Sequence, residues 1–183
     1  EKAVKSGKIR YWGFNGLGET DAIKSAVNLY SPSGIHTCYN MLNPTSGYSV
    51  NDAFPYQNYG ELLNECTSLG IGTVGIRILA GGALSGTPDR HPLALQEVAP
   101  IATGDTYQED VDRAVAYKFL INEGFVGNLA EAAVRFAISN TNLSTALIGL
   151  SNFDQIQKAI GFVNKGPLSN EALDKIRKLW SVT

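Results

Sequence analysis

The chain of 183 residues has few of the side chains that hold metals or form disulfides, with only two cysteines and two histidines. Cys38 and Cys66 are too few for the disulfide framework of a small secreted protein, and they lack the spacing of a zinc site. Two histidines with no acidic cluster nearby also argue against a metal site. The expected location is therefore the reducing cytoplasm.

Strong charge and long apolar runs are missing as well. Charged residues make up 17% of the chain and the net charge is −2, which gives no electrostatic attraction for nucleic acid or for an anionic membrane. No apolar run approaches the roughly 20 residues of a membrane span, and no signal peptide is visible. We therefore expect neither a nucleic-acid nor a membrane partner.

What the chain does have is a repeat of apolar strand, polar turn and amphipathic helix that runs four times. The strand candidates are residues 8–14, 35–40, 72–79 and 145–149. Strands that alternate with helices indicate βαβ units and a parallel sheet. Because a closed eight-stranded barrel usually needs about 250 residues, this pattern predicts an α/β fold that is the second half of a barrel.

Helical segments with apolar residues on one face are expected between and after the strands. The stretch 1–8 has the pattern of a helix end stopped by Gly7, for which a processed or truncated chain is the simplest explanation. No linker divides the chain, so we expect one incomplete domain over residues 1–183. The expected helices span about 19–30, 59–69, 108–122, 129–139 and 152–163, the last of these capped by Asn152, and a further helix runs from Ser169 to near Trp180.

A long polar loop is expected over residues 43–56, and loops of this length are usually functional or disordered. His91, between Arg90 and Pro92, is expected on a loop surface. Five tyrosines could be pocket or lid aromatics, although surface packing is the commoner role; they are Tyr39, Tyr48, Tyr56, Tyr59 and Tyr107.

Four blocks fall in order along the chain at the expected strand ends: 7–13 (GKIRYWG), 39–43 (YNMLN), 79–86 (LAGGALSG) and 148–156 (IGLSNFDQI). As a set they resemble the C-terminal half of the aldo-keto reductases. The resemblance implies a (β/α)8 TIM barrel of which this chain supplies strands five to eight, with their helices and a C-terminal helix. It also implies NADPH-dependent reduction of aldehydes or ketones, with a small-molecule carbonyl or sugar as the substrate.

In the family that this chain resembles, the catalytic Asp, Tyr, Lys and His come from the first half of the barrel. The resemblance therefore implies that this chain holds no catalytic residue, is inactive alone and needs the N-terminal half of the barrel as its partner. Two other interpretations stay open. One is a non-catalytic NADP(H)-binding sensor or regulatory subunit, and the other is a natural half-barrel that assembles with itself.

The resemblance assigns four residues to the nicotinamide end of the cofactor. Asn15, which Gly16 follows, matches a pair that binds the carboxamide, and a simple turn is the alternative. His36 stands where the family usually has Gln, and it could keep a donor there or be a barrel-interior histidine. Ile76 replaces an aromatic ring under the nicotinamide. Arg77 is expected to contact an anion or the carboxamide, with a salt bridge to the missing half as the alternative.

The resemblance places the cofactor phosphates after the third and fourth expected strands, where barrel phosphate sites form. A glycine-rich turn allows close backbone approach to a pyrophosphate, and a helix N-terminus offers unpaired N–H groups. Gln155 and Gly149 replace the family's Arg and Lys, so NADP(H) is expected with NAD(H) not excluded, and Lys158 is the one nearby substitute. The expected phosphate-end residues are Ala80, Gly81, Gly82, Gly149, Leu150, Ser151, Asn152 and Gln155.

Overall fold

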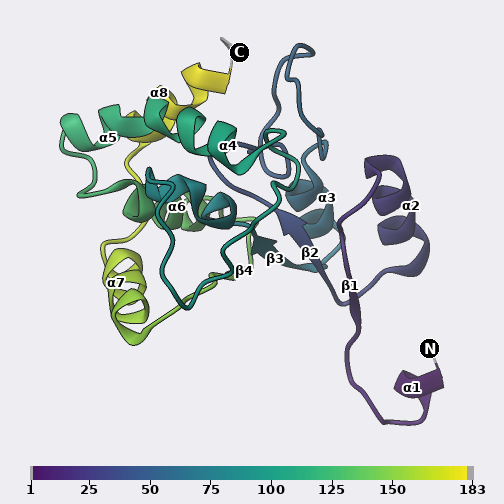
Figure 1. Cartoon of the computed structure of the whole chain (residues 1–183). Coiled ribbons are helices and arrows are strands. Elements are labelled where there is room, and N and C mark those ends of the chain that lie inside the picture. The colour runs from purple at the N-terminus through teal and green to yellow at the C-terminus, as the bar shows by residue number, and fades with distance from the viewer. Residues whose placement is uncertain (1, 181–183) are drawn as a thin grey trace.

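Four parallel strands form one sheet in the order in which they occur along the chain (Figure 1). The computed structural model describes residues 2–180. The strands are β1 (Gly13–Asn15), β2 (Gly34–Cys38), β3 (Gly72–Ile76) and β4 (Thr145–Ala146). The four predicted strands and their parallel order are confirmed.

The two outer strands are shorter than predicted. The segment 8–14 was expected to be extended throughout, but strand pairing begins only at Gly13, and β4 has two residues instead of the expected five. Both lie at sheet edges, where β1 pairs only with β2 and β4 only with β3. The inner strands also end before their predicted ends, β2 at Cys38 instead of residue 40 and β3 at Ile76 instead of residue 79, so the shortening is not confined to the edges.

The helices follow the expected order, and Figure 1 shows them around the sheet from α2 beside β1 to α7 beyond β4. The segment 108–122, expected as one helix, is instead divided into three short helices. Asn152 caps the helix that follows it, as predicted, because its side chain accepts a hydrogen bond from Gln155 N. The helices are α1 (Lys2–Lys5), α2 (Thr20–Tyr30), α3 (Leu62–Ser68), η1 (Ala80–Ser85), α4 (Tyr107–Ala114), η2 (Val115–Lys118), α5 (Phe119–Asn122), α6 (Leu129–Ile138), α7 (Phe153–Asn164) and α8 (Asn170–Trp180).

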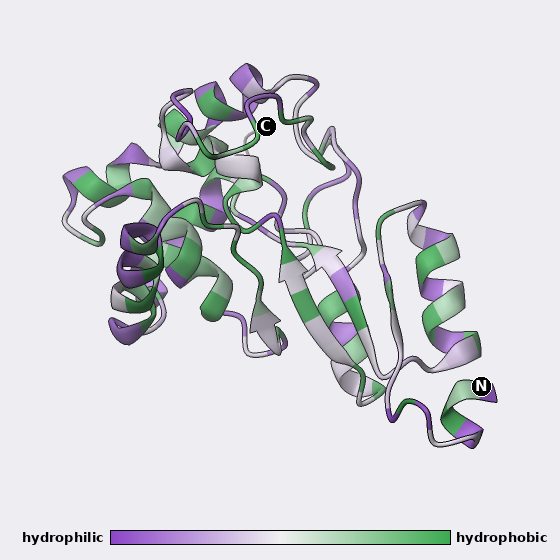
Figure 2. Cartoon of the chain, turned by 60° about the horizontal axis from the view of Figure 1, so that its bottom comes forward, coloured by the Kyte–Doolittle hydropathy of each residue, from purple (hydrophilic) through white to green (hydrophobic). Residues whose placement is uncertain are grey.

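The two faces of the sheet differ in burial. Ile35 and Thr73 lie in register and are buried, whereas Asn15 and His36, also in register with each other, are exposed. Successive residues of a strand point to opposite faces, and Figure 2 shows the resulting alternation of apolar and polar bands along the strands. One face is therefore packed on helices, and in the part of the chain that the structure describes the other face lies open.

The apolar core consists of two clusters. The smaller cluster joins the packed face of the sheet to α2 and α3 through residues such as Ile35, Val27 and Leu62. The larger one fills the space among η1, α4, α6 and α8. Tyr39 and Tyr59 belong to these clusters and are at most 1% exposed, so their interpretation as pocket, lid or surface aromatics was wrong.

The first part of the loop 43–56 is a buried hydrogen-bonded turn. Asn43, Thr45 and Ser46 are fully buried. The Asn43 side chain accepts from the Thr45 backbone and hydroxyl, and it donates to the carbonyls of Gln57 and Ala102. Buried polar groups are paired in stable folds, so this part of the loop has a structural role and is not disordered.

Candidate cofactor-binding site

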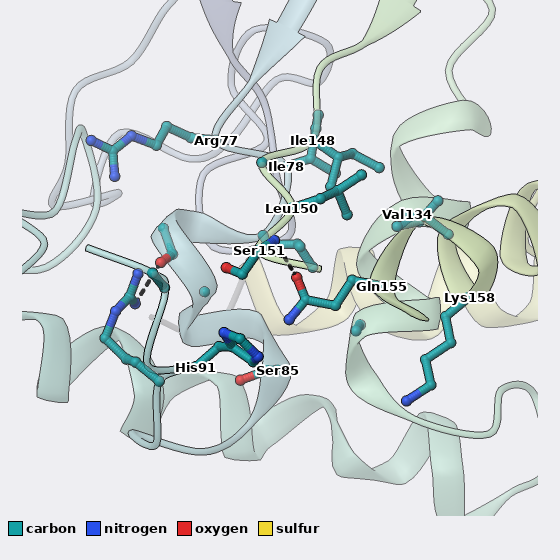
Figure 3. A pocket seen from close by; sticks show the side chains of 18 of the residues that line it. Arg77, Ile78, Ser85, His91, Val134, Ile148, Leu150, Ser151, Gln155 and Lys158 are labelled. Atoms are coloured by element: carbon teal, nitrogen blue, oxygen red, sulfur yellow. Dashed lines mark hydrogen bonds between the residues drawn. The ribbon is translucent and has the colours of Figure 1, made fainter. Parts of the chain in front are cut away.

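A cavity of about 970 Å³ opens where β3 and β4 end, between η1 and the start of α7 (Figure 3). Its size is within the range of ligand pockets. It draws together segments that are about 70 residues apart in the chain. The predicted cofactor residues that line it are Ile76, Arg77, Gly81, Gly82, Gly149, Leu150, Ser151 and Gln155.

Four predicted residues do not line the cavity. Asn15 and His36 lie on the open face of the sheet, in register on β1 and β2. Ala80 is 7% exposed and belongs to the larger core cluster, and Asn152 uses its side chain to cap α7. The contact with β2 continues one residue past Asn15, because Gly16 N donates to His36 O, and a Cβ atom on Gly16 would lie 2.5 Å from that oxygen.

The turn after β3 has an unusual backbone. Arg77 and Ala80 have φ angles of 58° and 48°, and Gly81 and Gly82 follow with 69° and 113°. Non-glycine residues seldom adopt this region, and such strain clusters at functional sites. A Cβ atom on Gly81 would also lie 2.6 Å from a Val98 methyl carbon. This turn therefore requires glycine, and it is covered by the loop that follows η1.

Arg77 presents its guanidinium to the cavity, and the residue itself is partly buried. Its main-chain carbonyl accepts from Asn40 Nδ2 at 2.9 Å and from Ala80 N at 2.7 Å. The guanidinium makes no hydrogen bond or ion pair with any residue that the structure describes. The backbone is thus fixed while the positive charge is available to a ligand.

Arg90 is a second cation of the cavity, and the sequence interpretation missed it. Its Nη1 donates to Gly81 O at 2.8 Å and its Nε to Leu95 O at 2.6 Å, and the guanidinium lies 5.0 Å from the Tyr107 ring centroid. These contacts fix the charge beside the glycine turn. His91 lines the same cavity from a loop position and is partly exposed, in agreement with its expected place on a loop surface; only the fold of the loop after η1 brings both residues back to the site.

The start of α7 forms the opposite wall. Gln155 Oε1 accepts a hydrogen bond of 2.7 Å from Ser151 N, as the dashed line in Figure 3 shows. Together with the Asn152 cap, this bond satisfies two of the N–H groups around the helix start. The helix dipole still favours negative charge here. A phosphate that reached Ser151 N would have to displace the Gln155 carboxamide.

Tyr39, Tyr59 and Tyr117, whose pKa values burial raises, do not line the cavity. Burial raises the pKa of Tyr117 to about 12, and its hydroxyl donates to Met41 O in the core. Burial also raises the pKa of Tyr39. Neither is placed to give a proton to a ligand in the cavity. Within residues 2–180, no group of three or more His, Cys, Asp or Glu side chains could hold a metal ion, and no helix there is long and apolar enough to cross a membrane.

The fold is that of an α/β protein with a parallel sheet. A family model described as "Aldo/keto reductase family" matches residues 1–181, and the chain belongs to that family. The comparison with curated proteins gave no match.

Among solved structures, the chain is similar to the aldo-keto reductase AKR11C1 from Bacillus halodurans in its apo and holo forms. Each comparison has a TM-score of 0.66 and 21% identity. Both cover all of this chain but only 55% of the apo chain and 54% of the holo chain. The likeness shows the α/β fold with its parallel sheet, which is consistent with part of a TIM barrel, and the chain spans about half the length of these relatives.

Proposed function

We propose that this chain is the cofactor-binding half of an aldo-keto reductase that reduces aldehydes or ketones, sugars among them, with NADP(H) or NAD(H). The observation that carries the proposal is the cavity at the ends of β3 and β4. Eight residues assigned to the cofactor from the sequence line it, and they come from the β3–η1 turn and the β4–α7 turn. In barrel enzymes the ligand lies at this end of the strands, with phosphate after strands seven and eight.

The donor set fits an anionic dinucleotide. The glycine turn allows the backbone to approach a pyrophosphate closely, and the Arg77 and Arg90 guanidiniums supply charge-assisted hydrogen bonds. The start of α7 adds backbone N–H groups and the helix dipole. In this proposal Ile76 packs against the nicotinamide, and Asn15 and His36 bind its carboxamide from the open face of the sheet.

The bound cofactor would supply the hydride that reduces the substrate carbonyl carbon. The residues of this chain bind and orient the cofactor and exclude water from its phosphates. The proton for the new hydroxyl comes from the other half of the barrel, since the catalytic Asp, Tyr, Lys and His that the family uses match no position here. The proposal thus assigns binding and orientation to this chain, and proton transfer to its partner half.

Two features support an N-terminal half as that partner. β1 and β4 each pair on one side only, and unpaired edges of a parallel sheet are unfavourable in water. The outer face of α7 carries exposed Phe153, Ile156, Ile160 and Val163. With spacings of three and four residues these side chains form one apolar stripe, which a neighbouring layer of the barrel would cover.

The test is a fluorescence titration of the native protein with NADPH and NADH, followed by turnover of a panel of aldehydes and ketones. We expect at least one dinucleotide to bind in the micromolar range, with turnover only when the N-terminal half is present. Absence of binding by both dinucleotides to a folded native protein would remove the proposal.

A further inference from the structure

The cations of the cavity are unevenly distributed. Arg77 and Arg90 lie at the β3–η1 side, where the glycine turn is. On the α7 side, Lys158 is the one cationic side chain among the described lining residues. The two walls therefore suit different parts of a dinucleotide, since only the first has fixed positive charge.

The α7 wall offers neutral donors where a second phosphate would need positive charge. Gln155 lines this wall, and its Oε1 already accepts from Ser151 N. Its remaining donors are the two N–H bonds of a neutral amide, which suit a ribose hydroxyl. Gly149 has no side chain, and the space around its Cβ position is empty within 4 Å. An Arg at such a site accommodates a 2′-phosphate, whereas a ribose 2′-OH needs only hydrogen-bonding groups.

Two charged side chains lie on α7 near this wall. Asp154 is exposed in the first turn of α7 and does not line the cavity. Lys158 is exposed as well, and Figure 3 shows it farther from Ser151 along α7 than Gln155. Exposed ion pairs contribute at most about 1 kcal/mol, so Lys158 by itself would add little to the binding of a 2′-phosphate.

From this charge distribution we propose that the cavity prefers NAD(H), the dinucleotide without a 2′-phosphate, over NADP(H). The inference rests on the proposed function and on the resemblance, which puts Gln155 and Gly149 where the family has the Arg and Lys beside the adenosine ribose. The sequence led us to expect NADP(H), with NAD(H) not excluded, and this proposal reverses that preference. Arg77 and Arg90 hold the pyrophosphate that both dinucleotides share, and the α7 wall discriminates between them.

The test compares the dissociation constants of NADH and NADPH on the native protein at one fixed salt concentration. We expect NADH to bind at least about tenfold more tightly, a difference of about 1.4 kcal/mol. Equal binding, or tighter binding of NADPH, would overturn the inference and leave the proposed function in place. Failure of both dinucleotides to bind would remove the proposed function and this inference with it.

Gln155→Arg and a matched control test the same idea by gain of function. Adding a guanidinium to the α7 wall should tighten NADPH binding about tenfold and change NADH binding by less than about threefold. Gln157→Arg adds the same charge to the same helix at an exposed residue that does not line the cavity, and it should shift neither constant. An equal effect of the two variants would mean that net charge and not position decides, which contradicts the inference.

Lys158→Ala tests whether the lysine binds the 2′-phosphate of NADPH. Because Lys158 is exposed, its removal should weaken NADPH binding by less than about fivefold. A selective tenfold loss of NADPH would show that Lys158 binds the 2′-phosphate, and the inference would be wrong.

Discussion

The side-chain amide of Asn40 donates a hydrogen bond of 2.9 Å to the main-chain carbonyl of Arg77. Its Oδ1 accepts from the N–H groups of Leu42 and Asn43 at 2.9 Å each. Asn40 is 1% exposed, and it ties the turn after β2 to the residue that starts the glycine turn after β3. A single buried amide thus fixes the backbone of Arg77 in its left-handed conformation.

Asn40→Ala should therefore weaken both folding and cofactor binding. The substitution leaves the buried N–H groups of Leu42 and Asn43 without partners, which costs about 2–4 kcal/mol in total. It also releases Arg77, so dinucleotide affinity should fall by about threefold or more. Urea unfolding and cofactor titration measure the two effects. The control is Asn28→Ala on the exposed face of α2, which should change stability by less than about 1 kcal/mol; similar losses in both variants would contradict the role of Asn40.

Gly149→Asp should reduce NADPH affinity at least about tenfold, or about 1.4 kcal/mol, by setting a carboxylate against the 2′-phosphate. Gly149 lines the cavity, and a Cβ atom there meets nothing within 4 Å, so the fold should tolerate the change. Gly161→Asp is the matched control, because Gly161 lies near the other end of α7 with the same free space. Unchanged affinity in the first variant would remove the β4–α7 turn from the site.

Glu131 should make the free energy of unfolding depend on pH in the acid range. Its carboxylate is buried, which raises the pKa, but hydrogen bonds from Lys165, Gly127 N and Arg135 outweigh burial and hold the pKa of Glu131 below its usual range. A lowered folded-state pKa contributes stability above the unfolded-state value, near about 4.3, that is lost as pH falls through the folded-state value.

The measurement is the urea midpoint at pH values between 7 and 3. Glu131→Gln should cost about 2 kcal/mol at pH 7, because charge-assisted hydrogen bonds are lost, and it should show a smaller further loss toward pH 3. Glu97→Gln, at an exposed loop position, should keep the dependence of the unchanged protein. If the acid loss has the same size in the Glu131→Gln variant as in the unchanged protein, the buried carboxylate is not its source.

The strands and helices could be predicted because their signals are local. The four strands, their parallel order and the Asn152 cap follow from apolar runs and from one side-chain oxygen that precedes a helix. The length of β1 did not follow, because Ile9, Tyr11 and Trp12 have the pattern of a strand although strand pairing begins only at Gly13. An apolar run indicates that its side chains can be buried. It does not indicate whether a partner strand lies beside them.

The candidate site could also be predicted only in part. The glycine turn and the β4–α7 turn could be found because they are short motifs at strand ends. Arg90 and His91 could not, because the loop after η1 carries no periodic pattern and only tertiary contacts with Gly81 and Leu95 return it to the cavity. Tyr39 was misassigned because an aromatic at a strand end suits a pocket as well as a core.

The exposed apolar stripe of α7 leads to the last prediction. Phe153 and Ile160 are 68% and 56% exposed, and β1 and β4 leave two unpaired edges. The chain of residues 1–183 expressed alone should therefore elute in gel filtration above its mass of 19.6 kDa and bind a dye that reports exposed apolar surface.

Co-expression with the N-terminal half of a full-length relative should abolish the dye signal, and Phe153→Ser with Ile160→Lys should reduce association without that half. A soluble monomer of 19.6 kDa that binds no dye would mean that the four strands form a complete fold, and the partner half would then be unnecessary for stability.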